Sequence, residues 1–183
     1  MGKSGGVSQQ QRREAYALNN QAAARLQEGR PEKALLLLRQ AEEMLPEDPS
    51  ILLNLGGAYL LLGQHDEAVA ALTRASEVAP EEPMIWCNLG AALLALSDDR
   101  DLDGQDRAIE AFRRALELDP KAANVAYNLG LVHRQREEWG AAAHYFRKAL
   151  EADPDDGHAR SLLCKMERRA ARESKGGEEY WEN

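Results

Sequence analysis

The sequence predicts an all-α fold of stacked helix pairs, because it repeats itself with the period of a helix–turn–helix unit. The segments "NLGGAYLLLG", "NLGAALLAL" and "NLGLVHRQR" begin at Asn54, Asn88 and Asn128 and align without a gap. Each is followed by a second helical pattern that ends at a proline, and an earlier "AEEMLP" closes a degenerate first copy. Proline disfavours helix at the residue before it, so these helices stop at regular positions. The closing prolines, which are 34, 40 and 34 residues apart, are Pro46, Pro80, Pro120 and Pro154.

Small residues recur at two sites of each copy, where a pair of helices has to approach closely. The two sites lie seven residues apart, and alanine fills both of them in every copy. Gly29 and Gly63 stand where the first helix of a pair ends, and a left-handed residue is often needed there. The alanines are Ala34, Ala68, Ala108 and Ala142 at the first site and Ala41, Ala75, Ala115 and Ala149 at the second, with the large residues Leu38, Leu72, Phe112 and Phe146 between them.

The 34-residue unit resembles the tetratricopeptide repeat over residues 15–156. The resemblance implies a solenoid, a right-handed superhelix of four antiparallel helix pairs that is closed by a C-terminal capping helix. The third repeat carries six extra residues between its two helices, at about 98–105. The predicted order is a flexible arm or helix extension at 1–14, repeats at 15–48, 49–82, 83–122 and 123–156, a capping helix at 157–174, and a tail at 175–183 that looks disordered by composition.

Composition narrows the class of protein. Of the 183 residues, 44% are hydrophobic and 30% are charged, and the net charge is −8. No stretch approaches the ~20 apolar residues of a membrane span, and the start lacks the apolar segment of a secretory signal. The negative net charge disfavours nucleic-acid binding, because phosphates are bound by clustered cations. The one basic segment, 160–175, is interpreted as a solvated helix face. Cys87 and Cys164 have no metal or redox spacing, so we expect reduced thiols in a cytoplasmic protein. No serine or cysteine lies in a nucleophile motif, so we expect no enzymatic activity.

The resemblance places a ligand on the concave face, which the first helix of each pair lines in this family. One asparagine maps to the same site of every repeat, and apolar side chains map beside it. An amide carries donors and an acceptor, so a row of amides can pair with the backbone of an extended peptide. The predicted peptide-binding residues are Asn20, Asn54, Asn88 and Asn128 for the backbone contacts, and Leu53, Leu60, Met84, Cys87, Tyr127 and Leu131 for an apolar floor.

The same asparagines could instead bond the neighbouring repeat and stabilise the stack, and the sequence leaves both roles open. A different binding mode is disfavoured. Family members that hold a C-terminal carboxylate do so with lysine and arginine in the groove, and the matching sites of this chain carry no cation. These sites hold Asn19, Ala23, Ser50, Met84 and Asn88.

The extra residues of the third repeat belong to an acidic segment, "DRDLDGQDRAIE" at 99–110. This segment matches D-x-D-x-D-G-x5-E and resembles the calcium loop of an EF-hand. Calcium takes about six to eight oxygen ligands, and alternate acids on a curled loop can supply several of them. The expected Ca²⁺ ligands are Asp99, Asp101, Asp103, Gln105 and Glu110.

An ordinary acidic loop is the alternative. Arg100 and Arg107 could neutralise the acids without a metal, and Asp106 would serve as the N-cap of the following helix. The sequence therefore yields three hypotheses of function. The chain is a scaffold that binds an extended partner peptide, or a module whose stability or binding is tuned by Ca²⁺, or a self-assembling structural protein that uses its solenoid ends or the tail with Tyr180 and Trp181.

Overall fold

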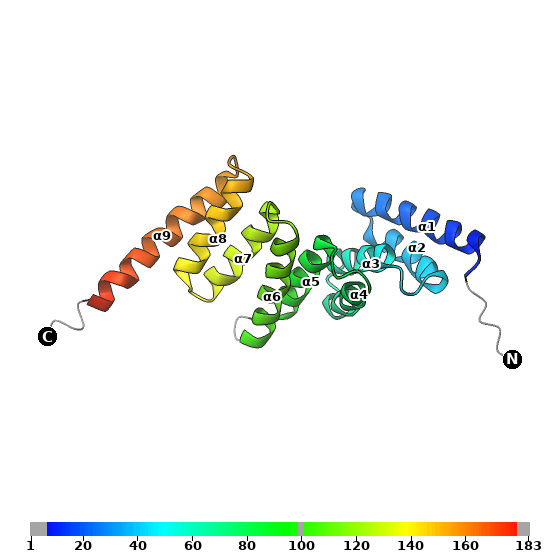
Figure 1. The fold of residues 1–183 in the computed structure, drawn as a ribbon, viewed down its shortest axis with the longest axis horizontal. Coiled ribbons are helices and arrows are strands. Elements are labelled where there is room, and N and C mark those ends of the chain that lie inside the picture. Colours follow the sequence, from blue (N-terminus) through cyan, green and yellow to red (C-terminus); the bar gives the residue numbers. More distant parts are fainter. Residues whose placement is uncertain (1–6, 99–100, 179–183) are drawn as a thin grey trace. The chain divides into compact units, whose positions relative to one another are not determined.

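The computed structural model describes residues 7–98 and 101–178. Every regular element among these residues is an α-helix, which confirms the predicted all-α fold (Figure 1). The chain divides into two compact units, residues 1–96 and 97–183. The third predicted helix pair is split between them, so each unit is described by itself. None of the helices in the described ranges is long and apolar enough to cross a membrane.

The first unit begins earlier than the predicted repeats. Helix α1 starts at Gln9, inside the segment expected to be a flexible arm or a helix extension, because Ser8 and Gln11 form a reciprocal capping box at its start. Proline then opens three of the following helices, α2, α3 and α5, at a position where its missing N–H has no cost. The helices of this unit are α1 (Gln9–Gln27), α2 (Pro31–Met44), α3 (Pro49–Leu61), α4 (His65–Val78) and α5 (Pro83–Leu96).

Consecutive helices of the first unit pack on one another, and α3 also contacts both α1 and α5. The first helices of successive repeats therefore lie next to each other in one layer. The core between the layers is built as the small-residue pattern predicts, since Ala34, Leu38 and Ala41 of α2 are all 0% exposed. Gly56 of α3 lies directly against the fully buried Leu72 of α4.

Left-handed residues end the first helix of several pairs. Gly29 has φ +68° and Gly63 has φ +69°, as predicted for these positions. At the corresponding turn of the second unit, the residue is Glu137, with φ +60°. A side chain in this conformation is strained relative to glycine.

The second unit contains α6 (Leu102–Leu118), α7 (Ala123–Gln135), α8 (Trp139–Ala152) and α9 (Gly157–Glu178). Helix α7 packs on α6 and α8, and α8 packs on α9. Two boundaries differ from the predicted ones. Helix α6 begins at Leu102, so much of the expected loop is helical, and α9 continues four residues beyond the predicted end of the capping helix. The acidic–aromatic segment at 179–183 lies outside the described residues.

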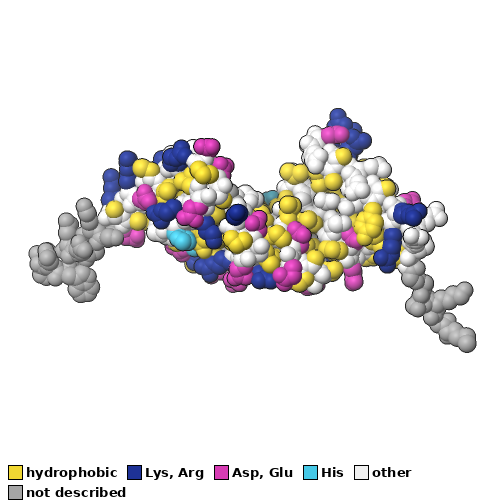
Figure 2. Space-filling model, turned by 45° about the horizontal axis from the view of Figure 1, so that its top comes forward, with side chains coloured by type: hydrophobic (Ala, Val, Ile, Leu, Met, Phe, Trp, Pro, Cys, Tyr) yellow, Lys and Arg dark blue, Asp and Glu magenta, His cyan; other side chains and the backbone are white. Residues whose placement is uncertain are grey.

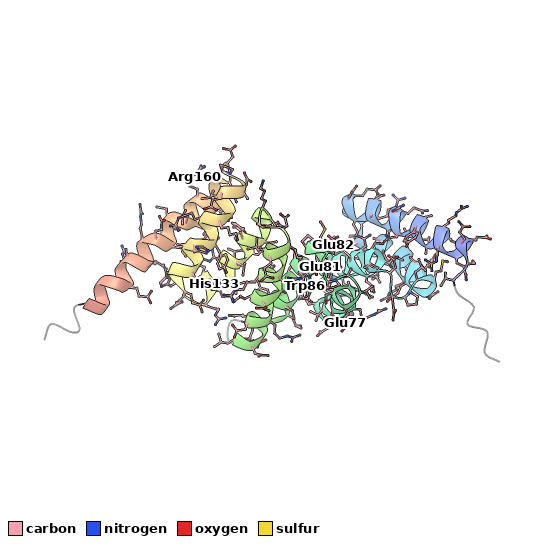
Figure 3. The ribbon with its side chains drawn as sticks, viewed as in Figure 1. Glu77, Glu81, Glu82, Trp86, His133 and Arg160 are labelled. Carbon is pink, nitrogen blue, oxygen red and sulfur yellow. The ribbon has the colours of Figure 1, made fainter. Side chains whose placement is uncertain are left out.

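Two turns between repeats are closed in the same way. The indole of Trp86 donates a hydrogen bond to the carbonyl of Pro80 at 2.8 Å, between α4 and α5. Arg160 donates to the carbonyl of Pro154, between α8 and α9. Figure 3 labels Trp86 and Arg160 in their two separate units. In each case, a donor six residues after the proline pairs with the carbonyl of the proline in the turn.

Candidate peptide-binding face

Helices α1, α3 and α5 present a stripe of side chains that recurs every 34 residues. Its first position is exposed in all three helices, its second is the predicted asparagine, and its third is a half-buried small residue. Because α3 contacts both α1 and α5, the three stripes form one face of the first unit. We call this the amide face. Its residues are Tyr16, Asn20 and Ala23 on α1, Ser50, Asn54 and Gly57 on α3, and Met84, Asn88 and Ala91 on α5.

The asparagines of the amide face differ in what they contact. Asn20 is exposed and Asn88 is half-buried, and within the described ranges neither side chain makes a hydrogen bond to protein. Asn54 is also half-buried, but its Nδ2 donates to Oδ1 of Asn19 at 2.8 Å. One amide of the row therefore serves the contact between repeats, as in the stack-stabilising alternative, while two keep their hydrogen-bonding capacity.

Asn19 belongs to a chain of hydrogen bonds that joins α1 to the start of α3. Its Nδ2 donates to Oγ of Ser50 at 3.2 Å, and Ser50 in turn donates to Oδ1 of Asp48 at 2.6 Å. The hydroxyl of Tyr16 donates to the other carboxylate oxygen of Asp48 at 2.8 Å. Asp48 also caps α3, because its side chain accepts from the backbone N–H groups of Ser50 and Ile51.

These contacts shift two pKa values in opposite directions. Burial would raise the pKa of Asp48, but the hydrogen bonds from Ser50, Tyr16 and two backbone N–H groups outweigh it, and the pKa lies below the usual 3.8. The hydrogen bond to the Asp48 carboxylate, together with its negative charge, raises the pKa of Tyr16. Asp48 is thus held as an anion that fixes the first position of two stripes.

The third position of the stripe leaves open space beside the amides. A Cβ added to Gly57 would meet no atom within 4 Å. The equivalent residues on the neighbouring helices are alanines, which are also small. A peptide backbone can therefore approach this row closely.

Apolar side chains lie near the amides. Met84, a predicted floor residue, is 58% exposed, and Leu61, which is not among the predicted residues, is 62% exposed, which is high for side chains of this size. The other predicted floor residues of this unit, Leu53, Leu60 and Cys87, are half-buried. The first unit thus brings together seven of the ten predicted peptide-binding residues on neighbouring helices.

The remaining three predicted residues lie on α7 in the second unit. Asn128 is half-buried and, among the residues described, its side chain makes no hydrogen bond. Tyr127 is committed to packing, because its ring meets Phe146 edge-on at 5.6 Å and its hydroxyl lies 2.7 Å from Nδ1 of His158. Leu131 is half-buried against the core of α8 and α9. A shallow cavity of about 640 Å³ opens beside Tyr127 and His158.

The acidic segment takes a helical conformation rather than that of a curled loop. Asp101, and not Asp106 as expected, is the N-cap of α6, and its side chain accepts from the N–H of Gly104 at 2.9 Å. Asp106 instead pairs with Arg136, the residue that follows α7. Gly104 is required here, because an added Cβ would lie 2.2 Å from Oγ of Ser97.

This conformation separates the predicted calcium ligands. Asp103 and Glu110 are exposed on α6 and seven residues apart, which is about 10 Å along a helix. Gln105 is fully buried, and its Nε2 donates to the carbonyl of Asp98 while its Oε1 has no partner. Asp99 lies outside the described residues. Within the described ranges, no group of three or more His, Cys, Asp or Glu side chains could hold a metal ion, so these side chains do not fit Ca²⁺ in this conformation. Calcium binding at 99–110 stays a prediction.

Sequence reasoning missed two polar clusters. The first is the Tyr16–Asp48–Ser50–Asn19 chain, for which the aspartate before Pro49 was a readable N-cap signal. The second joins α7 to the start of α8, where His133 is 5% exposed and its Nδ1 lies 2.5 Å from Oε2 of Glu138 (Figure 3). No sequence pattern marks this second cluster.

The comparisons with known proteins agree with this architecture. Family models for the tetratricopeptide repeat match residues 25–95 and 100–157. Cellulose synthase 2 operon protein C of Komagataeibacter xylinus is 38% identical over 63 residues, which are 34% of this chain and only 5% of that protein. The chain therefore spans a small part of the curated relative that it matches.

Two solved structures show the same fold. MamA (41-end) from Desulfovibrio magneticus RS-1 has a TM-score of 0.75 at 23% identity, and the match covers 96% of this chain and 93% of that one. TTC0263, a thermophilic TPR protein of Thermus thermophilus, has a TM-score of 0.71 at 23% identity, with 83% and 80% of the two chains covered. At these identities the likeness concerns the fold alone. With both family models and the helix pairing in agreement, the chain belongs to the tetratricopeptide repeat family.

Proposed function

We propose that the chain is a non-enzymatic interaction scaffold, and that its amide face binds an extended peptide segment of a partner protein. One observation carries the proposal. Asn20 and Asn88 present amides with no protein partner among the described residues, and the small residues beside them leave room for a ligand.

The chemistry of the amide face favours the backbone of a peptide as its ligand over a charged group. Amides donate to carbonyls and accept from N–H groups, so they can pair with any extended peptide without reading its sequence. Met84 and Leu61 flank them with exposed apolar surface, which favours apolar side chains in the peptide. No lysine or arginine occupies the nine positions of the amide face, so a terminal carboxylate has no counter-charge there.

Asn54 has a supporting role in this proposal. Its Nδ2 is bonded to Asn19, so it holds α1 and α3 in register and offers mainly its carbonyl oxygen to a ligand. Asn88 is the better residue to test, because its replacement by alanine leaves no described protein group without a partner.

The test starts from peptides selected with a phage-displayed library of random sequences. The strongest clone is synthesised, and its affinity for each variant is measured by fluorescence anisotropy. Gly57→Trp should abolish binding, because it fills the open space of the face without meeting the core. Asn88→Ala should weaken binding about 3- to 10-fold, since one net hydrogen bond contributes roughly 0.5–1.5 kcal/mol.

Two controls make the result specific. Gly57→Ala adds a single carbon to the same site and should leave binding within about twofold of the wild type. Arg39→Ala changes an exposed side chain on α2, outside the amide face, and should have no effect. Peptides that bind Gly57→Trp as tightly as the wild type would place the binding site elsewhere and reject the proposal.

A further inference from the structure

A basic groove lies at the C-terminal end of the second unit. It has a volume of about 500 Å³ and is formed by the end of α7, the start of α8 and one side of α9. Five of its eight lining residues are lysine or arginine, and none is acidic, although the whole chain has a net charge of −8. The cations are Arg134, Lys165, Arg168, Arg169 and Arg172.

Most of this positive charge is not neutralised by the residues that the structure describes. Arg134, Lys165, Arg168 and Arg172 are exposed, and no carboxylate of the described residues pairs with them. In Figure 2, dark-blue Lys and Arg side chains gather over the end of the molecule where α9 lies. The groove therefore has a positive potential that attracts an acidic ligand.

The floor of the groove is apolar. Leu162 is 6% exposed and Met166 is 4% exposed, and both pack in the core of α8 and α9. Trp139 is half-buried at the start of α8, and the guanidinium of Arg169 lies 4.4 Å from the centre of its ring. Cations around an aromatic floor suit a segment that carries both acids and an aromatic anchor.

The chain carries one such segment itself. Residues 178–183 read "EEYWEN", in which three glutamates surround Tyr180 and Trp181. We propose that the C-terminal segment of a second copy of this chain docks in the basic groove, with its aromatic pair on the floor and its glutamates against the cations. This site is separate from the amide face and does not depend on peptide binding there.

Helix geometry favours a second copy over the same chain. Helix α9 runs to Glu178, which is twelve residues or about 18 Å beyond Met166. Trp181 follows Glu178 by three residues, and these span about 10 Å at most when extended. The backbone of the aromatic pair therefore ends about 8 Å short of Met166 even when it is fully extended, so a second copy reaches the floor more directly. Since the groove and the segment lie at the same end of the chain, two copies can exchange segments reciprocally, which closes a two-fold dimer.

The experiment measures the mass of the full chain by sedimentation over a wide concentration range. We expect a reversible rise toward twice the 20.3 kDa of one chain, and a weaker dimer at high salt. Arg168→Glu/Arg172→Glu should raise the dimer dissociation constant at least about tenfold, and Tyr180→Ala/Trp181→Ala should do the same from the other side of the contact. Combining Arg168→Glu/Arg172→Glu with Glu179→Lys/Glu182→Lys should restore the dimer, because the charges are exchanged.

Matched variants separate docking from general effects of charge. Lys33→Glu/Arg39→Glu makes the same change of net charge on α2 and should leave the dimer intact, as should Gly57→Trp. If Arg168→Glu/Arg172→Glu melts early, the neutral Arg168→Gln/Arg172→Gln replaces it. A chain that keeps the mass of one copy at all concentrations overturns the proposal, and so does a dimer that both tail and groove variants leave unchanged. Binding of single-stranded DNA through Arg168 and Arg172 without dimerisation would assign the groove to nucleic acid and also overturn it.

Discussion

Two adjacent glycines in α3 offer the sharpest test of the packing described above. A Cβ on Gly56 would lie 2.3 Å from Cγ of Leu72 and 2.6 and 2.8 Å from its two methyl carbons, whereas a Cβ on Gly57 would meet nothing within 4 Å. Both replacements by alanine gain about 0.5–1 kcal/mol of helix propensity. Only Gly56→Ala also overpacks the core, at a cost of about 1–3 kcal/mol. Because the propensity gain is common to both, the difference in stability between the two variants isolates the clash.

We expect Gly57→Ala to unfold at higher urea concentration than the wild type, and Gly56→Ala to be about 1–3 kcal/mol less stable than Gly57→Ala. Unfolding is followed by circular dichroism, with the slope on urea compared between variants, since repeat arrays do not always unfold in one step. In a Leu72→Ala background, the penalty for Gly56→Ala should disappear, because the atoms that it meets are gone. Equal stability of the two single variants would refute the close approach of α3 and α4 at Gly56.

Three further outcomes follow from particular contacts. Asp48→Asn should lower stability by up to about 1 kcal/mol at pH 7. Because folding lowers the pKa of Asp48, its charge stabilises the protein above the usual value of 3.8, and the difference in melting temperature between the two proteins should vanish as the pH falls through the lowered pKa of the folded state. Melting in EDTA and in millimolar CaCl2 tests the predicted calcium site: a midpoint that rises in calcium, and that Asp101→Asn returns to the EDTA value, would support it, whereas equal midpoints would show that the acids stay apart as they do on α6. Gly130→Ala should cost about 1–2 kcal/mol in urea unfolding, because its Cβ would lie 2.7 Å from the ring of the buried Phe146, and an unchanged midpoint would contradict that contact.

Local periodicity made the core predictable. Alanine at the first small site is buried in all four copies, and the conformation of Gly29 and Gly63 follows from their place at a helix end. Such features depend only on neighbours within one repeat, so one copy of the pattern is enough to read them. The same periodicity placed one asparagine at the matching site of each first helix.

Contacts between repeats could not be predicted from the periodicity of the sequence. Whether an asparagine meets solvent or its neighbour depends on how two helices cross, and consecutive residues of a helix point about 100° apart. Asn20 was correctly matched to Asn54, yet the amide that Asn54 reaches is that of Asn19. The start of α6 was misjudged for a related reason, because Asp101 can be a calcium ligand or a helix cap, and its sequence neighbours fit either role.

The turn between α7 and α8 is held differently from the turns of the first unit. Glu137 occupies a left-handed conformation that costs a side chain about 1–2 kcal/mol, where Gly29 and Gly63 adopt it freely. The residues on either side of Glu137 make polar contacts that can offset this cost. Arg136 pairs with Asp106, and Glu138 contacts the buried His133. The turn between α7 and α8 is therefore stabilised by side-chain contacts. Mutations that remove these contacts should make the turn more mobile before they disturb the surrounding hydrophobic core.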